Sequence, residues 1–298
     1  MLPARIVDRF KVKDGNKFRL ADFDPADTFG LNIEKDEAKE LLASGVKRLR
    51  ELQERLYAEG RWSILVVLQA MDAAGKDSAI EHVMSGINPQ CCEVRSFKAP
   101  EPTELKHDYL WRTTIALPER GRVGIFNRSY YEEVLVVRVH PEALANEKLP
   151  PDLVTKDIWK ERFEDIRSFE RHIHRNGTVL LKFYLHISKD EQKRRFLRRI
   201  DDPTKRWKFS IADVAKRGFW DDYMVAYEDM IHHTATADCP WYVVPADNKW
   251  FSRLVIAAAI VEALKKLDPQ FPTVDDAALK TLESARAALI DEDSKKMQ

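Results

Sequence analysis

Residues 63–78, SILVVLQAMDAAGKDS, join a short apolar run to a glycine–lysine pair that stands just before a helical pattern. The apolar part is rich in branched residues and too short for a helix, which is typical of a parallel strand covered on both faces. A strand that turns directly into a helix leaves free N–H groups at the helix N-terminus, where the helix dipole favours an anion. The stretch therefore predicts a phosphate-binding turn after a buried strand.

The residues of this turn suit a phosphate group. Gly75 permits close approach of the backbone, and Lys76 supplies a positive charge for a phosphoryl oxygen. A complete P-loop, GxxxxGK followed by Ser or Thr, would have glycine at Ala70 and a hydroxyl residue at Asp77. An ordinary strand–helix turn with a surface lysine is the alternative. The predicted phosphate-binding residues of the turn are Ala73, Ala74, Gly75, Lys76, Asp77 and Ser78.

Two carboxylates, Asp72 and Asp77, bracket the turn. A carboxylate beside a bound phosphate repels it unless a cation lies between them, and Mg²⁺ commonly joins one or two carboxylates to substrate phosphates. The turn therefore predicts a Mg²⁺ site at one or both of these carboxylates. For Asp77 the alternative is a helix N-terminal residue that interacts with the dipole.

Four further apolar runs follow the first one at wide spacing, at residues 93–97, 122–126, 178–187 and 241–244. Helical patterns lie between them, at residues 78–87, 103–117, 156–175, 189–200 and 250–267. Strands that are separated by helices need crossover connections, and these join parallel strands. The sequence thus predicts an α/β fold, a doubly wound sheet of about five parallel strands.

The residues before and after this pattern indicate the domain organisation. Residues 1–34 have no sustained period and are interpreted as an irregular N-terminal arm, whereas leucines at helical spacing from Lys35 predict a helix that ends at Gly60. Residues 35–267 are predicted to form a single domain. Residues 268–298 are predicted to hold a last helix, at 275–290, and a polar tail.

Composition excludes several classes of protein. The 298 residues carry 49 Lys and Arg against 49 Asp and Glu, a balance that argues against a nucleic-acid binder of the histone type. No run of eighteen apolar residues occurs and the N-terminus lacks the apolar stretch of a signal peptide, so we expect a cytoplasmic protein without membrane contact. Three cysteines without CxxC spacing predict neither disulfides nor a thiolate metal site.

Polar side chains follow the second and third predicted strands. Lys98 and Arg112 come after the second, and residues 127–133, NRSYYEE, end the third. Because ligands gather at the carboxyl ends of strands in α/β sheets, we expect these residues to face the phosphate-binding turn.

Three stretches carry a resemblance to a known family. Residues 71–81, MDAAGKDSAIE, residues 97–112, FKAPEPTELKHDYLWR, and residues 124–142, GIFNRSYYEEVLVVRVHPE, resemble the family-2 polyphosphate kinases. The similarity covers roughly residues 35–265 and implies a P-loop kinase fold similar to thymidylate kinase. It also implies reversible, Mg²⁺-dependent phosphoryl transfer between inorganic polyphosphate and nucleotides, by a homo-oligomer, a dimer or tetramer.

Site residues carry over from that resemblance by position. Asp72 and Lys76 match the metal-organising acid and the phosphate-binding base of the family's P-loop. Asn127 and Arg128 match its second signature, where many members have Asp-Arg-Ser, so the metal role is expected at Asp72. The Asn-Arg-Ser variant is similar to the subgroup that accepts both AMP and ADP. The further predicted phosphate- and nucleotide-binding residues of these two stretches are Lys98, Arg112, Glu132 and Glu133.

The segment 193–208 is basic within a neutral chain. On a helix its arginines stand four apart on shared faces, an arrangement that is unfavourable without an anion or another partner. The resemblance makes residues 189–215 a lid whose arginines close on the transferred phosphates; the alternative is a solvated charged helix. The lid arginines predicted to bind phosphate are Arg194, Arg195, Arg198 and Arg199.

Phosphoryl transfer needs in-line positioning and charge stabilisation rather than a protein nucleophile. Asp72, Lys76 and Arg128 are therefore the predicted catalytic residues, with Mg²⁺ as cofactor and polyphosphate, ATP, ADP and AMP as substrates. Two alternatives remain open at this point: a nucleoside monophosphate kinase that uses ATP, and a nucleotide- or polyanion-binding module without turnover.

Overall fold

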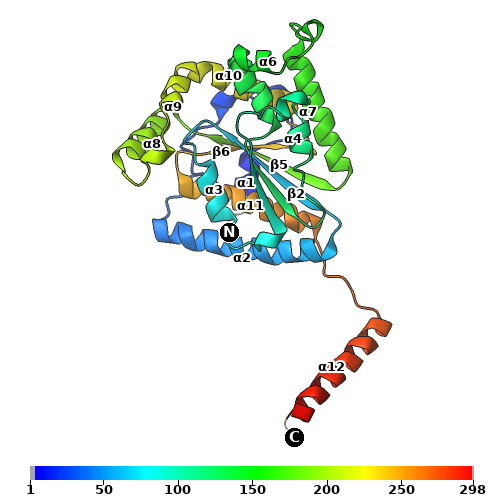
Figure 1. The fold of residues 1–298 in the computed structure, drawn as a ribbon. Coiled ribbons are helices and arrows are strands. Elements are labelled where there is room, and N and C mark those ends of the chain that lie inside the picture. Colours follow the sequence, from blue (N-terminus) through cyan, green and yellow to red (C-terminus); the bar gives the residue numbers. More distant parts are fainter. Residues whose placement is uncertain (1–3, 297–298) are drawn as a thin grey trace.

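The sheet of the computed structural model, which describes residues 4–296, has five parallel strands and one antiparallel strand at its edge (Figure 1). The strands run in the order β1-β6-β5-β2-β4-β3. Their bounds are Lys11–Val12 (β1), Ser63–Ala70 (β2), Cys92–Ser96 (β3), Val123–Asn127 (β4), Thr178–His186 (β5) and Trp241–Pro245 (β6). The predicted α/β fold with a doubly wound parallel sheet is confirmed, and β1 is an addition to it.

Strand β2 lies at the centre of the parallel part, with β4 on one side and β5 on the other. The chain passes through β3 and β4 on the first side and through β5 and β6 on the second, so the direction of winding reverses at β2. Leu68 of β2 pairs with Asn127 of β4. The loops that leave these two strands therefore emerge side by side, at the topological switch point where ligands bind in such sheets.

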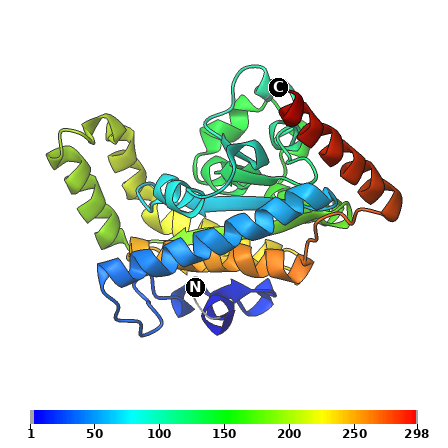
Figure 2. The same ribbon diagram turned by 90° about the horizontal axis from the view of Figure 1, so that it is seen from below.

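Helices cover both faces of the sheet. Helices α2 and α11 run side by side on one face, while α7 and α10 cover the other (Figures 1 and 2). Helices α8 and α9 project from the carboxyl edge of the sheet and span most of the predicted lid (Figure 1). The helices are α1 Ala4–Arg9, α2 Lys35–Glu59, α3 Lys76–Val83, α4 Trp111–Thr114, α5 Val136–Val139, α6 Pro141–Asn146, α7 Ile158–Arg175, α8 Lys189–Asp201, α9 Ile211–Lys216, α10 Trp220–Thr234, α11 Lys249–Leu267 and α12 Asp276–Lys296.

Helix α2 follows its sequence pattern. Leu49, Leu52 and Leu56 of the predicted apolar stripe are buried, and the helix packs against α11, whose residues 254–261 are all apolar. It ends as predicted at Gly60, whose φ of 64° is left-handed and whose N–H donates to the Leu56 carbonyl at 3.0 Å.

The structure corrects two details of the predicted local structure. Within residues 4–34, the predicted irregular arm includes two short regular elements: α1 and β1 bring Ile6, Val7 and Phe10 into the core, and these elements are too short to show a period. The helix predicted at 103–117 is broken into a 3₁₀ turn, Glu104–Lys106, and α4. Between them the Asp108 carboxylate accepts the Leu110 N–H at 2.9 Å, a local turn that competes with the helix.

A buried polar cluster anchors the segment that follows β4. Lys182 of β5 is fully buried and its Nζ donates to Glu170 Oε2 of α7 at 2.7 Å. The hydroxyls of Tyr130 and Tyr131 donate to Glu170 Oε1 at 2.9 and 2.5 Å. Because both tyrosines directly follow Arg128-Ser129, this cluster fixes the backbone that presents Arg128.

The C-terminal helix α12 extends away from the sheet in Figure 1 and is longer than the predicted 275–290. The ends of the predicted arm and tail, residues 1–3 and 297–298, lie outside the described residues. Across residues 4–296, no helix combines the length and apolarity that crossing a membrane requires.

Candidate active site

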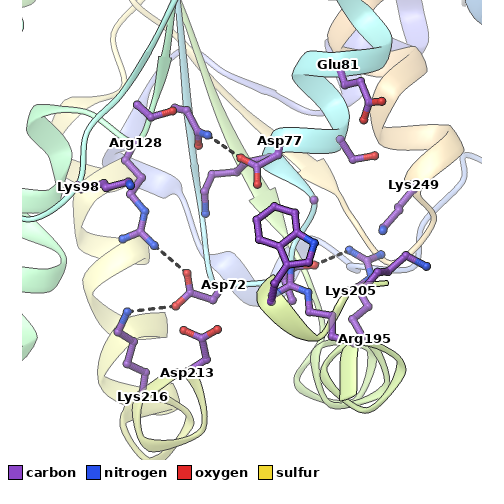
Figure 3. A pocket seen from close by; sticks show the side chains of 18 of the residues that line it. Asp72, Asp77, Glu81, Lys98, Arg128, Arg195, Lys205, Asp213, Lys216 and Lys249 are labelled. Carbon is purple, nitrogen blue, oxygen red and sulfur yellow. Dashed lines mark hydrogen bonds and ion pairs between the residues drawn. The ribbon is translucent and has the colours of Figure 1, made fainter. Parts of the chain in front are cut away.

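A cleft of about 830 Å³ opens at the carboxyl edge of the sheet. Its walls come from the turn after β2, from the end of β4, from α8 and α9, and from the start of α11 (Figure 3). Nine Lys and Arg residues line it against four Asp and Glu residues, an excess of five positive charges. The net charge of the whole chain is zero, whereas the net charge of this cleft is positive. A cleft of this kind suits an anionic ligand.

The predicted phosphate-binding turn has the backbone of an anion cradle. Ala73 and Gly75 take left-handed φ values of 64° and 110°, the second of which favours glycine strongly. Lys76 begins α3 and is buried, with its Nζ donating to the Ala70 carbonyl at 2.8 Å. A phosphate that enters the cleft would offer this ammonium group charged acceptors in place of the loop carbonyls.

The protonation of Lys76 makes anion binding dependent on pH. Burial, and then the nearby charge of Arg128, lower the pKa of Lys76 to about 8. Above that pH the free protein loses the charge, so the dissociation constant of inorganic tripolyphosphate is expected to rise up to about tenfold per pH unit. Calorimetric titration from pH 6.5 to 9.5 measures this.

The titration of Lys249 must be distinguished from that of Lys76, because burial and the charge of Arg195 lower the pKa of Lys249 to about 8 as well. Lys249→Met should keep most of the loss of affinity above pH 8, whereas Lys76→Met should reduce that loss to the part due to Lys249. A dissociation constant that stays flat to pH 9.5 in Lys249→Met would show that Lys76 is not the titrating group.

Asp72 lines the cleft and is bonded to two cationic side chains. Its Oδ1 accepts Arg128 Nη2 at 2.8 Å and its Oδ2 accepts Lys216 Nζ at 3.3 Å (Figure 3). Burial opposes its ionisation, but the charges of Lys76, Arg128 and Lys216 hold its pKa below the ordinary value. The side chain is therefore a carboxylate at neutral pH.

Arg128 is held from both ends of its guanidinium. Besides the bond to Asp72, its Nη1 donates to Glu132 Oε2 at 3.0 Å, and the charge of Glu132 raises the pKa of Arg128. Its backbone φ of 64° is left-handed, an uncommon conformation for a non-glycine residue. Backbone strain of this kind clusters at active sites and ligand clamps in proteins.

Asn127 lines the cleft but, unlike an aspartate, carries no negative charge. Its Nδ2 donates to Asp77 Oδ1 at 2.7 Å, which joins the end of β4 to the first turn of α3. An aspartate at position 127 would repel Asp77 at this distance.

The carboxylates of the cleft fit a divalent cation of the oxygen-seeking type. Among residues 4–296 no group of three His, Cys, Asp or Glu is placed to hold a metal alone. Asp72, Asp77 and Asp213 nevertheless line the cleft, and one or two carboxylates with substrate oxygens are what Mg²⁺ uses. Burial and the charge of Asp72 raise the pKa of Asp213.

Most predicted site residues line the cleft, and several do not. Arg112 donates instead to the Lys98 carbonyl and pairs with Glu104, and Glu133 is buried against Arg162. Arg194 is exposed on α8 beside Glu191. The predicted residues that line the cleft are Asp72, Ala73, Gly75, Lys76, Asp77, Ser78, Lys98, Asn127, Arg128, Arg195, Arg198 and Arg199; those outside its lining are Ala74, Arg112, Glu132, Glu133 and Arg194.

Several residues of the cleft stand outside any motif of the sequence. Lys216 and Asp213 lie in α9, and Lys249 opens α11. Each is a single charged residue outside any motif, so only the fold brings it to the phosphate-binding turn. The lysine just after the last strand had one usable signal, because loops at that edge of the sheet also reach the cleft.

Comparisons with known proteins agree on one family. The family model described as polyphosphate kinase 2 matches residues 32–272. The ADP-polyphosphate phosphotransferase of Rhodopseudomonas palustris is 50% identical over 283 residues, covering 95% of this chain and 98% of the relative. The AMP/ADP-polyphosphate phosphotransferase of Meiothermus ruber is 45% identical over 274 residues, covering 92% and 98%. The crystal structure of polyphosphate kinase 2 from Arthrobacter aurescens TC1 matches with a TM-score of 0.83 and 40% identity, covering 92% and 95%.

Proposed function

The chain belongs to the polyphosphate kinase 2 family, and we propose that it moves a phosphoryl group between inorganic polyphosphate and adenine nucleotides. The proposed reactions are ADP to ATP and AMP to ADP, both reversible and dependent on Mg²⁺. The similarity to an ADP-polyphosphate phosphotransferase and to an AMP/ADP-polyphosphate phosphotransferase supports these acceptors.

The observation that carries this proposal is the charge of the cleft. Nine cationic side chains surround one phosphate-binding turn, more than a single phosphate group could engage. A polyanion and a nucleotide that meet at the turn would use cations on both sides of it. Lys98 and Lys216 lie on one side of the cleft, and Lys205 and Lys249 on the other (Figure 3).

The residues of the cleft have different roles in phosphoryl transfer. The Lys76 ammonium exchanges its bond to the Ala70 carbonyl for a phosphoryl oxygen and holds the reacting phosphate against the turn. Arg128, fixed by Asp72 and Glu132, offsets the negative charge that grows on the transferred group. Arg198 and Arg199 of α8 line the same cleft and add to this stabilisation. No side chain acts as a nucleophile.

Asp72, with Asp77 or Asp213, would hold the divalent cation. When bound, Mg²⁺ would supply Lewis-acid neutralisation of the phosphate oxygens. Asp72 is already ionised in the free protein, so its own part is to give up the bond of Oδ2 to Lys216 in favour of that ligand role, while Oδ1 keeps its bond to Arg128.

Donor and acceptor tests separate the candidate functions. Purified protein is given ADP or AMP as acceptor, long-chain polyphosphate or ATP as donor, and Mg²⁺, and nucleotides are separated by ion-exchange chromatography. We expect ATP from ADP with polyphosphate, and ADP from AMP with the same donor. Phosphorylation of AMP by ATP alone would identify a nucleoside monophosphate kinase. Binding without turnover would identify a non-catalytic module.

We further propose a homo-oligomer in the cytoplasm, a dimer or tetramer. Size-exclusion chromatography with light scattering tests the assembly, and a monomer at micromolar concentration would overturn it.

A further inference from the structure

Three successive carbonyl groups of the phosphate-binding turn are bound by α8. Gln192 Nε2 donates to the Asp72 carbonyl at 2.9 Å. Arg195 Nη1 donates to the carbonyls of Ala73 and Ala74 at 3.0 and 2.7 Å. These two side chains stand three apart on α8, so one helix face meets the turn.

Because the peptide bond is planar, bonds to these carbonyls also fix the directions of the neighbouring N–H groups. In a planar trans peptide the C=O of one residue and the N–H of the next point in opposite directions. Carbonyls that point toward α8 at residues 72 and 74 therefore aim the N–H groups of Ala73 and Gly75 away from it. Both residues line the cleft. The Ala74 N–H closes the turn on the Met71 carbonyl at 3.3 Å.

The remaining donors of Arg195 reach a different segment. Its Nη2 donates to the carbonyls of Ala246 and Asp247, after β6, at 2.6 and 3.0 Å, and its Nε donates to Glu191 Oε1 at 2.6 Å. All five N–H groups of the guanidinium thus have protein acceptors, and the side chain is 4% exposed. A guanidinium saturated in this way has no donor left for a bidentate phosphate bond.

We propose that Arg195, with Gln192, is a positioning residue that sets the peptide planes of the phosphate-binding turn, and that it does not bind phosphate itself. The base of α8 is then a fixed support rather than part of a moving lid. The N-cap residue that precedes α8 is also held in place, because the Ser188 N–H donates to Asp247 Oδ1 at 2.8 Å. The inference rests on the proposed function, since it assigns the turn to substrate phosphates.

Salt dependence separates a positioning residue from a phosphate ligand. The affinity of a polyanion falls with salt in proportion to the number of phosphates that cations neutralise, by a slope of about one per contact. The dissociation constant of polyphosphate is measured from 50 to 400 mM KCl for the wild type, Arg195→Met, Gln192→Met and Arg198→Met. We expect the wild-type slope in the first two variants and a slope lower by about one in Arg198→Met.

Measurements of kcat distinguish a positioning role of Arg195 and Gln192 from a purely structural role. At saturating substrates, kcat per folded molecule should fall about 100-fold in Arg195→Met and about tenfold in Gln192→Met, whereas Arg50→Met, at an exposed arginine of α2, should match the wild type. Gln192→Met loses only one bond to the turn, so it serves if Arg195→Met does not fold.

Two results would overturn the inference. One is a reduced salt slope in Arg195→Met, which would make the residue a phosphate ligand. The other is a lower melting temperature with unchanged kcat in both variants, which would make the contacts structural only. Lack of turnover in the wild type would refute the proposed function instead.

Discussion

Replacing Lys76 with methionine is expected to lower kcat for ATP formation from ADP and polyphosphate by a hundredfold to a thousandfold. Methionine keeps the length of the side chain but removes the ammonium group that begins α3 and reaches the phosphate-binding turn. Loss of one preoriented donor to a developing negative charge costs about 2.7–4 kcal/mol in comparable sites. Initial rates from a luciferase assay at saturating substrates measure the change.

The fold should survive this substitution. Lys76 is a buried charge that bonds loop carbonyls in the free protein, so removing it also relieves a desolvation cost. A melting temperature within a few degrees of the wild type, by circular dichroism, would show that the loss is chemical. A rate within threefold of the wild type would contradict the role assigned to Lys76.

Asp72→Asn is expected to lower kcat by about a hundredfold and to raise the Mg²⁺ concentration for half-maximal rate by about tenfold or more. Asparagine preserves the shape of the side chain but removes the charge that faces Arg128 and Lys216. Arg128 would keep only Glu132 as its anionic partner, so the guanidinium would be less firmly placed. Rates over a series of Mg²⁺ concentrations, at fixed nucleotide and polyphosphate, separate the two effects.

Asp77→Asn is the matched comparison, because this carboxylate lies on the same turn but bonds Asn127 rather than a cation. Its effect on the Mg²⁺ requirement should be smaller than that of Asp72→Asn. Equal effects would mean that the two carboxylates share the cation. An unchanged Mg²⁺ requirement in Asp72→Asn would remove Asp72 from the metal site.

Sequence patterns predicted the parts of the fold that repeat over many residues. The continuous apolar run at Ser63–Ala70 and the periodic apolar stripe of α2 are long enough to be recognised in the sequence, and Gly60 marks the end of α2. The N-terminal elements α1 and β1 escaped prediction because six-residue and two-residue segments acquire their structure from the core that they complete. Tertiary contacts, rather than local propensity, decide such segments.

The same distinction applies to the site. Asp72, Lys76 and Arg128 stand in motifs directly after strands, so their position at the carboxyl edge was predictable. Lys216 and Lys249 come from helices far along the chain, and only the folded sheet brings them to the turn. The arginines of α8 looked alike in sequence, yet Arg195 is saturated by backbone carbonyls whereas Arg198 is 62% exposed. Charge at a given spacing does not say which acceptors surround it.

Production of ATP from ADP and long-chain polyphosphate, measured side by side for the wild type and Lys76→Met, tests the central claim most directly. The account predicts ATP formation by the wild type in the presence of Mg²⁺, and a rate at least a hundredfold lower in the variant. A folded wild-type protein that forms no ATP from these substrates, or a variant that forms it at the wild-type rate, would contradict the account.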